Sequence, residues 1–111
     1  MEIREKHTET HITLAPVGDL DANSSIHLDE RISELVEEGA LRIHVDFKGV
    51  NYVSSAGWGV FISYLEEMNA RNGKIVLSNM SDSVRDVYDL LGLDQLISVA
   101  ENDEAVANFF I

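Results

Sequence analysis

Two adjacent serines open the segment whose residue types are best suited to chemistry. Residues 54–59 read Ser-Ser-Ala-Gly-Trp-Gly and follow a loop over residues 48–53. A helical pattern of apolar residues starts at Val60, so the serines are predicted to lie at a helix N-terminus. Unpaired backbone N–H groups and the positive end of the helix dipole favour a phosphate there. Ser55 is therefore a candidate phosphorylation site, although a serine that only caps the helix has the same pattern.

Nucleophilic catalysis is a second chemistry open to Ser55. A nucleophile elbow requires Gly-x-Ser-x-Gly, and Val53 stands where its first glycine would be. A base is also required within hydrogen-bond reach of the hydroxyl. The four histidines fall in predicted strands, where we expect them to be solvated, or on the polar side of a predicted helix: His7, His11, His44 and His27. None is predicted to converge on Ser55, so we do not expect an enzyme.

An acidic loop before the first predicted helix has part of the pattern of a calcium-binding loop. Asp19, Asp21 and Asn23 alternate with other residues, and Glu30 falls where such a loop places its last ligand. Ser24 occupies the position that requires glycine, and the preceding segment is typical of a strand rather than a helix. We therefore expect no metal site and no cofactor.

Trp58 lies one turn after the serines. Tryptophan is usually part of the core, but the apolar stripe of this helix is already supplied by Val60, Phe61 and Tyr64, and Trp58 lies off its centre. An exposed tryptophan beside a regulated serine would be a natural anchor for a binding partner. Core packing and partner binding both remain open for this residue.

The elements that position these residues alternate between strands and helices. Strands are predicted over residues 2–7, 11–15, 41–47, 74–78 and 96–99. The four helices are predicted to begin near residues 23–25, 54–55, 81 and 102, where Asn or Ser can cap them. This order predicts an α/β domain over residues 1–111, with a mixed, largely parallel β-sheet of about five strands. Alternation around Ile43 indicates one sheet face that is wet or only lightly covered, so about four helices should pack mainly on the other.

Composition limits the classes of function. The chain has 111 residues, 45% of them hydrophobic, and no cysteine, which excludes disulfides and thiolate metal sites. Eight Lys and Arg stand against twenty Asp and Glu, a net charge of −12 that repels phosphate backbones and anionic lipids. No apolar run approaches the roughly 20 residues of a membrane helix, and the charged residues 1–6 lack the apolar stretch expected of a signal peptide. We expect a cytoplasmic protein with no direct nucleic-acid binding and no membrane insertion.

Two motifs resemble those of STAS domains. Residues 18–21, Gly-Asp-Leu-Asp, are similar to the Gly-Glu-Leu-Asp segment of that family, and residues 51–60 are similar to its Phe-x-Asp-Ser-Ser-Gly-Leu-Gly-Val loop. The resemblance extends over nearly the whole chain, including the order of elements. The family comprises bacterial anti-sigma factor antagonists and the cytoplasmic domains of sulfate transporters.

The resemblance implies a phosphorylation switch. Antagonists of this kind bind an anti-sigma factor that is also a serine kinase, and binding releases the sigma factor. The kinase inactivates them by phosphorylating the serine after the loop aspartate, and a serine phosphatase reverses the modification. Matched residue by residue, the acceptor is Ser55, with Ser54 as the fallback. Ser54 occupies the aspartate position and Ala56 the position of the second hydroxyl.

The resemblance also implies a partner-binding surface. We expect it to comprise the acidic loop and the start of the second helix: Asp19, Asp21, Asn23, Ser54, Ser55, Gly57 and Trp58. An alternative of the same fold is a non-phosphorylated scaffold subunit of a transport complex. A small serine hydrolase using Ser55 is the less favoured alternative.

Overall fold

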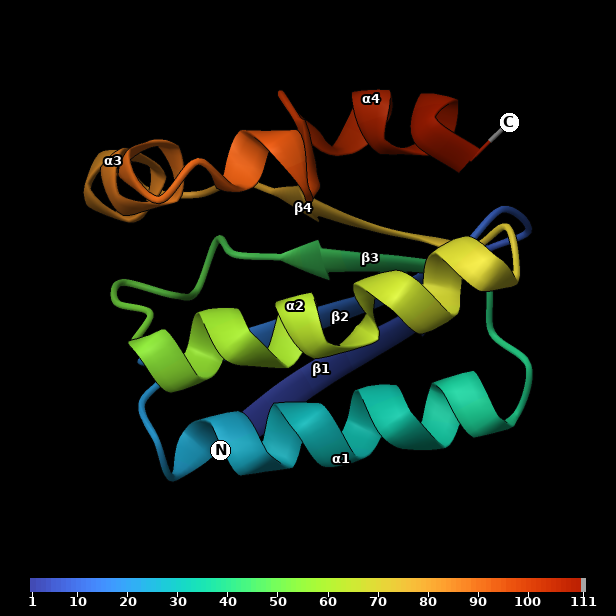
Figure 1. Cartoon of the computed structure of the whole chain (residues 1–111), viewed down its shortest axis with the longest axis horizontal. Coiled ribbons are helices and arrows are strands. Elements are labelled where there is room, and N and C mark those ends of the chain that lie inside the picture. The colour runs from blue at the N-terminus through green and yellow to red at the C-terminus, as the bar shows by residue number, and fades with distance from the viewer. Residues whose placement is uncertain (111) are drawn as a thin grey trace.

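Five strands form one sheet in the order β1-β2-β3-β4-β5 in the computed structural model, which describes residues 1–110 (Figure 1). The strands are β1 Glu2–His7, β2 Ile12–Val17, β3 Arg42–Asp46, β4 Lys74–Ser78 and β5 Ser98–Ala100. The edge strand β1 pairs antiparallel with β2, and all other neighbours pair in parallel. The predicted mixed, largely parallel sheet is therefore confirmed.

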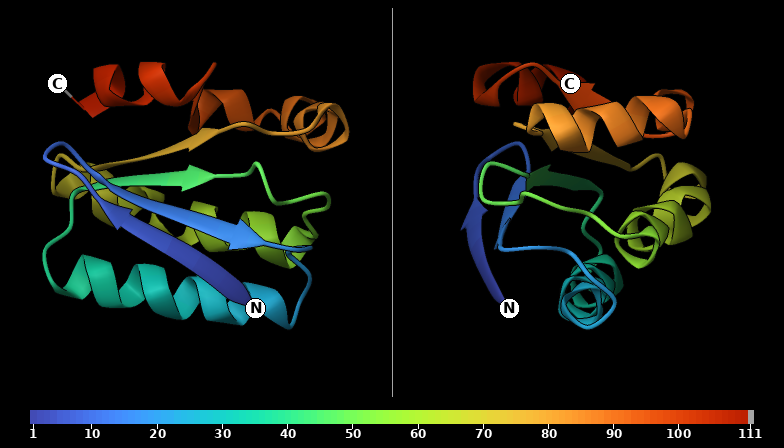
Figure 2. Two further views of the ribbon diagram at one scale, coloured as in Figure 1. Left: turned by 180° about the vertical axis from the view of Figure 1, so that it is seen from behind. Right: turned by 90° about the vertical axis from the view of Figure 1, so that its left-hand side faces the viewer.

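Four α-helices connect or follow the strands in the predicted order. They are α1 Ser24–Glu37, α2 Ser55–Ala70, α3 Asp82–Leu90 and α4 Asp103–Val106, with short 3₁₀ helices η1 Leu93–Gln95 and η2 Ala107–Phe110. Helices α1 and α2 lie side by side over one face of the sheet, as the end-on view in Figure 2 shows. None of the helices within residues 1–110 combines the length and the apolar composition needed to cross a membrane.

The main core lies between the sheet and the helices α1, α2 and α3. Helix α1 contributes Leu28, Ile32 and Leu35 at helical spacing, and all three are 0–1% exposed. The sheet contributes alternate residues such as Ile43 and Val45 of β3, which point toward the same core. This packing fixes the two long helices against the sheet, and so fixes where they begin.

The second face of the sheet is covered in part, in line with the prediction of a wet or lightly covered face, and β1 stays largely exposed. The α4–η2 segment covers β4 and β5 with a smaller apolar cluster of Val76, Ala100, Val106 and Phe110. His44 is 3% exposed, and its ring hydrogen bonds to Thr13 Oγ1 at 3.0 Å and Ser78 Oγ at 2.5 Å. Alternation shows which residues face away from the main core, but it does not show whether a distant segment covers them. The expectation of a solvated His44 is therefore wrong.

Candidate functional site

Two loops meet at the edge of the sheet where β2 and β3 end. Leu20, in the β2–α1 loop, and Val53, in the β3–α2 loop, form an isolated parallel bridge. Leu20 N–H donates to the carbonyl of Tyr52 at 2.8 Å, and Ser54 N–H donates to the carbonyl of Leu20 at 2.8 Å. The two motifs found in the sequence are therefore joined by backbone hydrogen bonds, because parallel strands end at the same edge.

The two serines at the start of α2 have different roles. Ser54 is the N-cap: its backbone is extended, and its Oγ accepts a hydrogen bond from Gly57 N–H at 3.2 Å. Ser54 is half-buried, whereas Ser55, the first residue of α2, is exposed. Within residues 1–110 the Ser55 hydroxyl makes no hydrogen bond to a side chain or to the backbone. Of the two hydroxyls, that of Ser55 is the one that an approaching enzyme could reach.

Gly57 lies inside the junction rather than on its surface. A Cβ on Gly57 would lie 2.7 Å from Val53 Cγ1 and 3.0 Å from the Leu20 carbonyl oxygen. A glycine is therefore required for α2 to approach the bridge so closely. Gly59, two residues further on, has open space around the equivalent position.

Trp58 belongs to the core, so the interpretation of it as an exposed anchor is wrong. It is 3% exposed, and its ring centroid lies 6.0 Å from that of Phe47, 6.3 Å from that of Phe61 and 6.1 Å from that of Tyr88. The apolar stripe of α2 faces the sheet, but α3 packs beside it and encloses Trp58 from the flank. The residue pattern of α2 alone cannot predict this contact with α3.

The acidic loop positions its own polar groups. Asp21 Oδ1 accepts hydrogen bonds from Ser24 N–H at 2.9 Å, Ser24 Oγ–H at 3.1 Å and Asn23 N–H at 3.0 Å. The hydrogen bonds from Ser24, followed by that from Asn23, hold the pKa of the Asp21 carboxyl below its ordinary value. The predicted caps are wrong: Asn23 is in the α conformation without a side-chain cap bond, and Asp21 satisfies the start of α1 instead.

The predicted partner-binding residues divide into two groups. Asp19, Asp21, Asn23 and Ser55 are exposed at the joined loops, and Ser54 is half-buried beside them, whereas Gly57 and Trp58 are buried below. No group of three or more His, Cys, Asp or Glu side chains within residues 1–110 is arranged to hold a metal ion. The exposed part of the predicted site is thus a small acidic surface around one hydroxyl.

Three of the four histidine rings, those of His7, His11 and His44, are hydrogen-bonded to groups other than Ser55. Their hydrogen bonds within residues 1–110 go to Glu5, Thr10, Thr13 and Ser78. No imidazole is therefore bonded to Ser55, and the geometry gives no support to serine catalysis.

Hollows on the surface flank the start of α2. One, of about 280 Å³, lies between α1 and α2 and includes Ala56 and Gly59. Another, of about 170 Å³, lies between the β3–α2 loop and α3 and includes Tyr52, Trp58 and Val87. The sequence patterns did not indicate a functional role for Tyr52 or Val87. Tyr52 is 54% exposed. An aromatic residue in a loop next to a candidate serine was the available indication.

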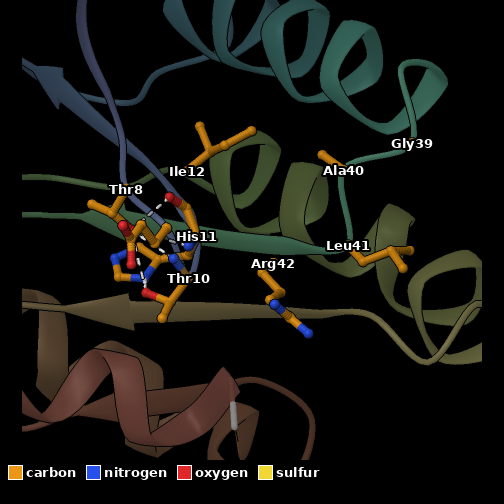
Figure 3. A pocket seen from close by; sticks show the side chains of 9 residues that line it. Thr8, Thr10, His11, Ile12, Gly39, Ala40, Leu41 and Arg42 are labelled. Carbon is orange, nitrogen blue, oxygen red and sulfur yellow. Dashed lines mark hydrogen bonds between the residues drawn. The ribbon is translucent and has the colours of Figure 1, made fainter.

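A third hollow lies at the opposite edge of the sheet, where β2 and β3 begin. It has a volume of about 400 Å³ and is lined by the turn at residues 8–12 and by residues 39–42 (Figure 3). Its polar groups bond to one another: Thr8 Oγ1 accepts from the N–H of Thr10 at 3.2 Å and from that of His11 at 3.0 Å. These bonds shape the β1–β2 turn.

The chain belongs to the STAS domain family, whose model matches residues 2–106. It is 29% identical to the anti-sigma-B factor antagonist of Bacillus subtilis over 99 residues, which are 89% of this chain and 90% of that protein. Its fold is that of the Bacillus cell fate determinant SpoIIAA in the phosphorylated form, with a TM-score of 0.74, 24% identity, and coverage of 97% of this chain and 99% of that one.

A second solved structure is similar over almost the full length. It is an anti-sigma factor antagonist from Mycobacterium paratuberculosis, with a TM-score of 0.87, 15% identity, and coverage of 98% of this chain and 92% of that one. At these identities the two structures establish the fold.

Proposed function

We propose that this protein is an anti-sigma factor antagonist whose unphosphorylated form binds an anti-sigma factor with serine kinase activity and so releases a sigma factor. Phosphorylation of Ser55 inactivates it, and a serine phosphatase restores it. The protein acts in the cytoplasm as a binding partner and not as an enzyme. Membership of the STAS family and the names of the similar proteins support this proposal.

The observation that carries the proposal is the different environment of the two serines. Ser54 uses its hydroxyl to cap α2, whereas Ser55 exposes an unbonded hydroxyl at the first position of the helix. A phosphate on Ser55 would lie at the positive end of the α2 dipole, so the fold tolerates it without rearrangement. Ser55 is therefore the proposed acceptor, and Ser54 is the fallback only if its cap opens.

The proposed switch acts through charge at the interface. Phosphorylation adds about −1.5 to −2 charges at pH 7. This added negative charge would lie beside the exposed Asp19 and Asp21, on a chain whose net charge is already −12. A charge that is desolvated against a partner without compensation costs several kcal/mol, enough to lower affinity by orders of magnitude. Binding and release then require no change of fold.

Mass spectrometry of the peptide that contains Ser54 and Ser55 tests the site. The chain should be recovered from the cells that produce it, together with its bound proteins. We expect phosphate on Ser55 and a bound protein that transfers it from ATP. A chain that is never phosphorylated there, and that is found with transporter subunits, would instead support the scaffold alternative.

Affinity measurements test the switch itself. With the kinase so identified, Ser55→Ala should bind as tightly as the unmodified chain, and Ser55→Asp should bind at least about tenfold more weakly. Asn108→Asp, which adds the same charge in η2, is the control and should not change the affinity. Equal affinities for the two Ser55 variants would contradict the proposed switch.

A further inference from the structure

The groove between the β3–α2 loop and α3 has features that the switch at Ser55 does not use. It is lined by Asn51, Tyr52, Val53, Trp58, Ser83, Val84 and Val87, and its volume is about 170 Å³. A cavity of about 150 Å³ holds a benzene molecule, so this groove is large enough for one aromatic or branched aliphatic side chain. Its wall is mainly apolar, as expected of a site that takes such a side chain.

Trp58 gives the groove an unsatisfied donor. The Trp58 side chain is 3% exposed, and within residues 1–110 its indole N–H has no hydrogen-bond partner. Leaving a buried donor unpaired is unfavourable, and native proteins rarely do so. An acceptor carried by an occupant, reached by a small rotation of the ring, would remove that cost. The groove therefore suits an occupant that brings both an apolar side chain and a hydrogen-bond acceptor.

The apolar surface continues from the groove along α3. Val87, Leu90 and Leu91 are 39%, 83% and 56% exposed, and their spacing of three and four residues places them on one face of the helix and its cap. Tyr52, 54% exposed, lines the opposite side of the groove. Adjoining exposed apolar side chains of this kind mark interaction surfaces more often than isolated ones do.

The charges beside this face determine what can cover it. Asp82, Asp86 and Asp89 follow one another at helical spacing and form an acidic row next to the apolar face of α3. Of the three, Asp89 bonds to Arg85, at 3.3 Å. A second copy of this chain would bring its own acidic row and a net charge of −12 against the first. Charge complementarity instead favours an occupant with basic residues beside its apolar ones.

We propose that this groove and the adjoining α3 face are the docking site for an amphipathic, basic helix of the protein partner, which inserts one apolar side chain against Trp58. The identity of that partner rests on the proposed function, but the docking site does not. Ser55 lies three residues beyond Tyr52, so the groove and the phosphorylation site form adjoining parts of one surface. The groove supplies the apolar contact of that surface.

A pair of synthetic helices tests the site without the partner. One peptide, about 18 residues long, carries leucines along one face and lysines beside them; the other replaces each lysine with glutamate. Trp58 is the only tryptophan, so the ¹⁵N-labelled chain has a single indole N–H resonance. We expect the lysine peptide to shift that resonance and those of α3 saturably, and the glutamate peptide to leave them unchanged. Shifts confined to α1, where Glu30, Glu34 and Glu37 are exposed, would overturn the proposal.

An exposed valine and an exposed isoleucine provide matched variants. Val87→Glu places a charge in the groove and should weaken binding of the lysine peptide at least about tenfold. Ile62→Glu, on α2 at 43% exposure against 39% for Val87, should change it by less than about twofold. Equal effects of the two substitutions on peptide binding would overturn the docking site. That outcome would leave the proposed phosphorylation of Ser55 untouched. If Val87→Glu does not fold, the peptide titration of the unmodified chain still decides between the outcomes.

Discussion

At the scale of single residues, the functional surface depends on how two neighbouring hydroxyls are used. Ser54 Oγ accepts a hydrogen bond from Gly57 N–H and so caps the start of α2. The hydroxyl of Ser55 is exposed and makes no hydrogen bond within residues 1–110. A serine in place of the family aspartate can perform this cap, because both residue types accept hydrogen bonds at an N-cap. The substitution therefore preserves the local geometry while removing one negative charge from the loop.

Replacing the two serines separately should distinguish these roles. Ser54→Ala removes the cap acceptor and should lower the free energy of unfolding by about 1 kcal/mol. Ser55→Ala, which removes no hydrogen bond found in the structure, should change it by less than about 0.5 kcal/mol. Urea denaturation followed by Trp58 fluorescence measures both values. A larger loss in Ser55→Ala than in Ser54→Ala would show that the assignment of the cap is wrong.

At the scale of elements, the site exists because α2 begins almost in contact with the β2–α1 loop. Gly57 allows that approach, and the Leu20–Val53 bridge joins the two loops beneath it. Further along, α1 and α2 are joined by the Tyr64 hydroxyl, which donates to Asp29 Oδ1 at 2.7 Å. Burial, followed by the bond to Asp29, raises the pKa of Tyr64 to about 12. The helices therefore hold the two loops in a fixed relation.

Two glycines of α2 provide a matched test of that close approach. In Gly57→Ala the new methyl group would lie 2.7 Å from Val53 Cγ1, so the helix or the bridge must move. We expect a loss of about 1–3 kcal/mol in the free energy of unfolding. Gly59→Ala meets no atom within 4 Å and should stabilise the helix by up to about 1 kcal/mol. Chemical denaturation of both variants provides the comparison, and a stable Gly57→Ala would contradict the packing described.

At the scale of the whole molecule, the C-terminal segment covers part of the second sheet face, and the burial of histidines there makes stability depend on pH. Burial lowers the pKa of His44 below its ordinary value; Asp46 and Asp103 oppose that shift, and His11 adds to it. Burial also lowers the pKa of His11, which stacks on Phe110. At the edge of the sheet, the Arg31 side chain bonds to Glu5 and, with smaller help from His7, lowers the pKa of that carboxyl to about 2.

Acidification should therefore destabilise the fold in two stages. Between about pH 7 and pH 5 the unfolded chain binds protons at His11 and His44 more readily than the folded chain does, so stability falls as pH falls. Below about pH 5, protonation of Glu5 is likewise favoured in the unfolded chain, and the fall continues. Urea midpoints measured from pH 7.5 downward should show both stages.

A pair of histidine variants tests whether His44 causes the first stage of this loss of stability. His44→Gln should be less stable at pH 7.5 but should depend less on pH between 7 and 5, because the group that titrates is gone. His27→Gln, at an exposed position of α1, is the control and should keep the original dependence. If both variants keep it equally, His44 is not the source of the pH dependence.

The sequence by itself determined the order of elements, the largely parallel sheet and the candidate serine. Those features depend on local patterns: alternation in strands, helical spacing of apolar residues, and caps such as Ser81 and Asn102, which the structure confirms. The predicted cap near Asn23 was wrong because Asp21, two residues earlier, accepts the N–H groups of Asn23 and Ser24 through its side chain and that of Ser25 through its carbonyl. Local patterns thus located the helix start correctly but not the residue that satisfies it.

Only the tertiary structure decided which faces are covered and which side chains reach the surface. His44 is buried because a segment about sixty residues later in the chain packs over β4 and β5 and closes that face, and Trp58 is buried because α3 packs beside α2. The groove at Trp58 arises from the same packing, since its two sides come from a loop and a helix about thirty residues apart. Such contacts between distant segments leave no periodic pattern in the sequence.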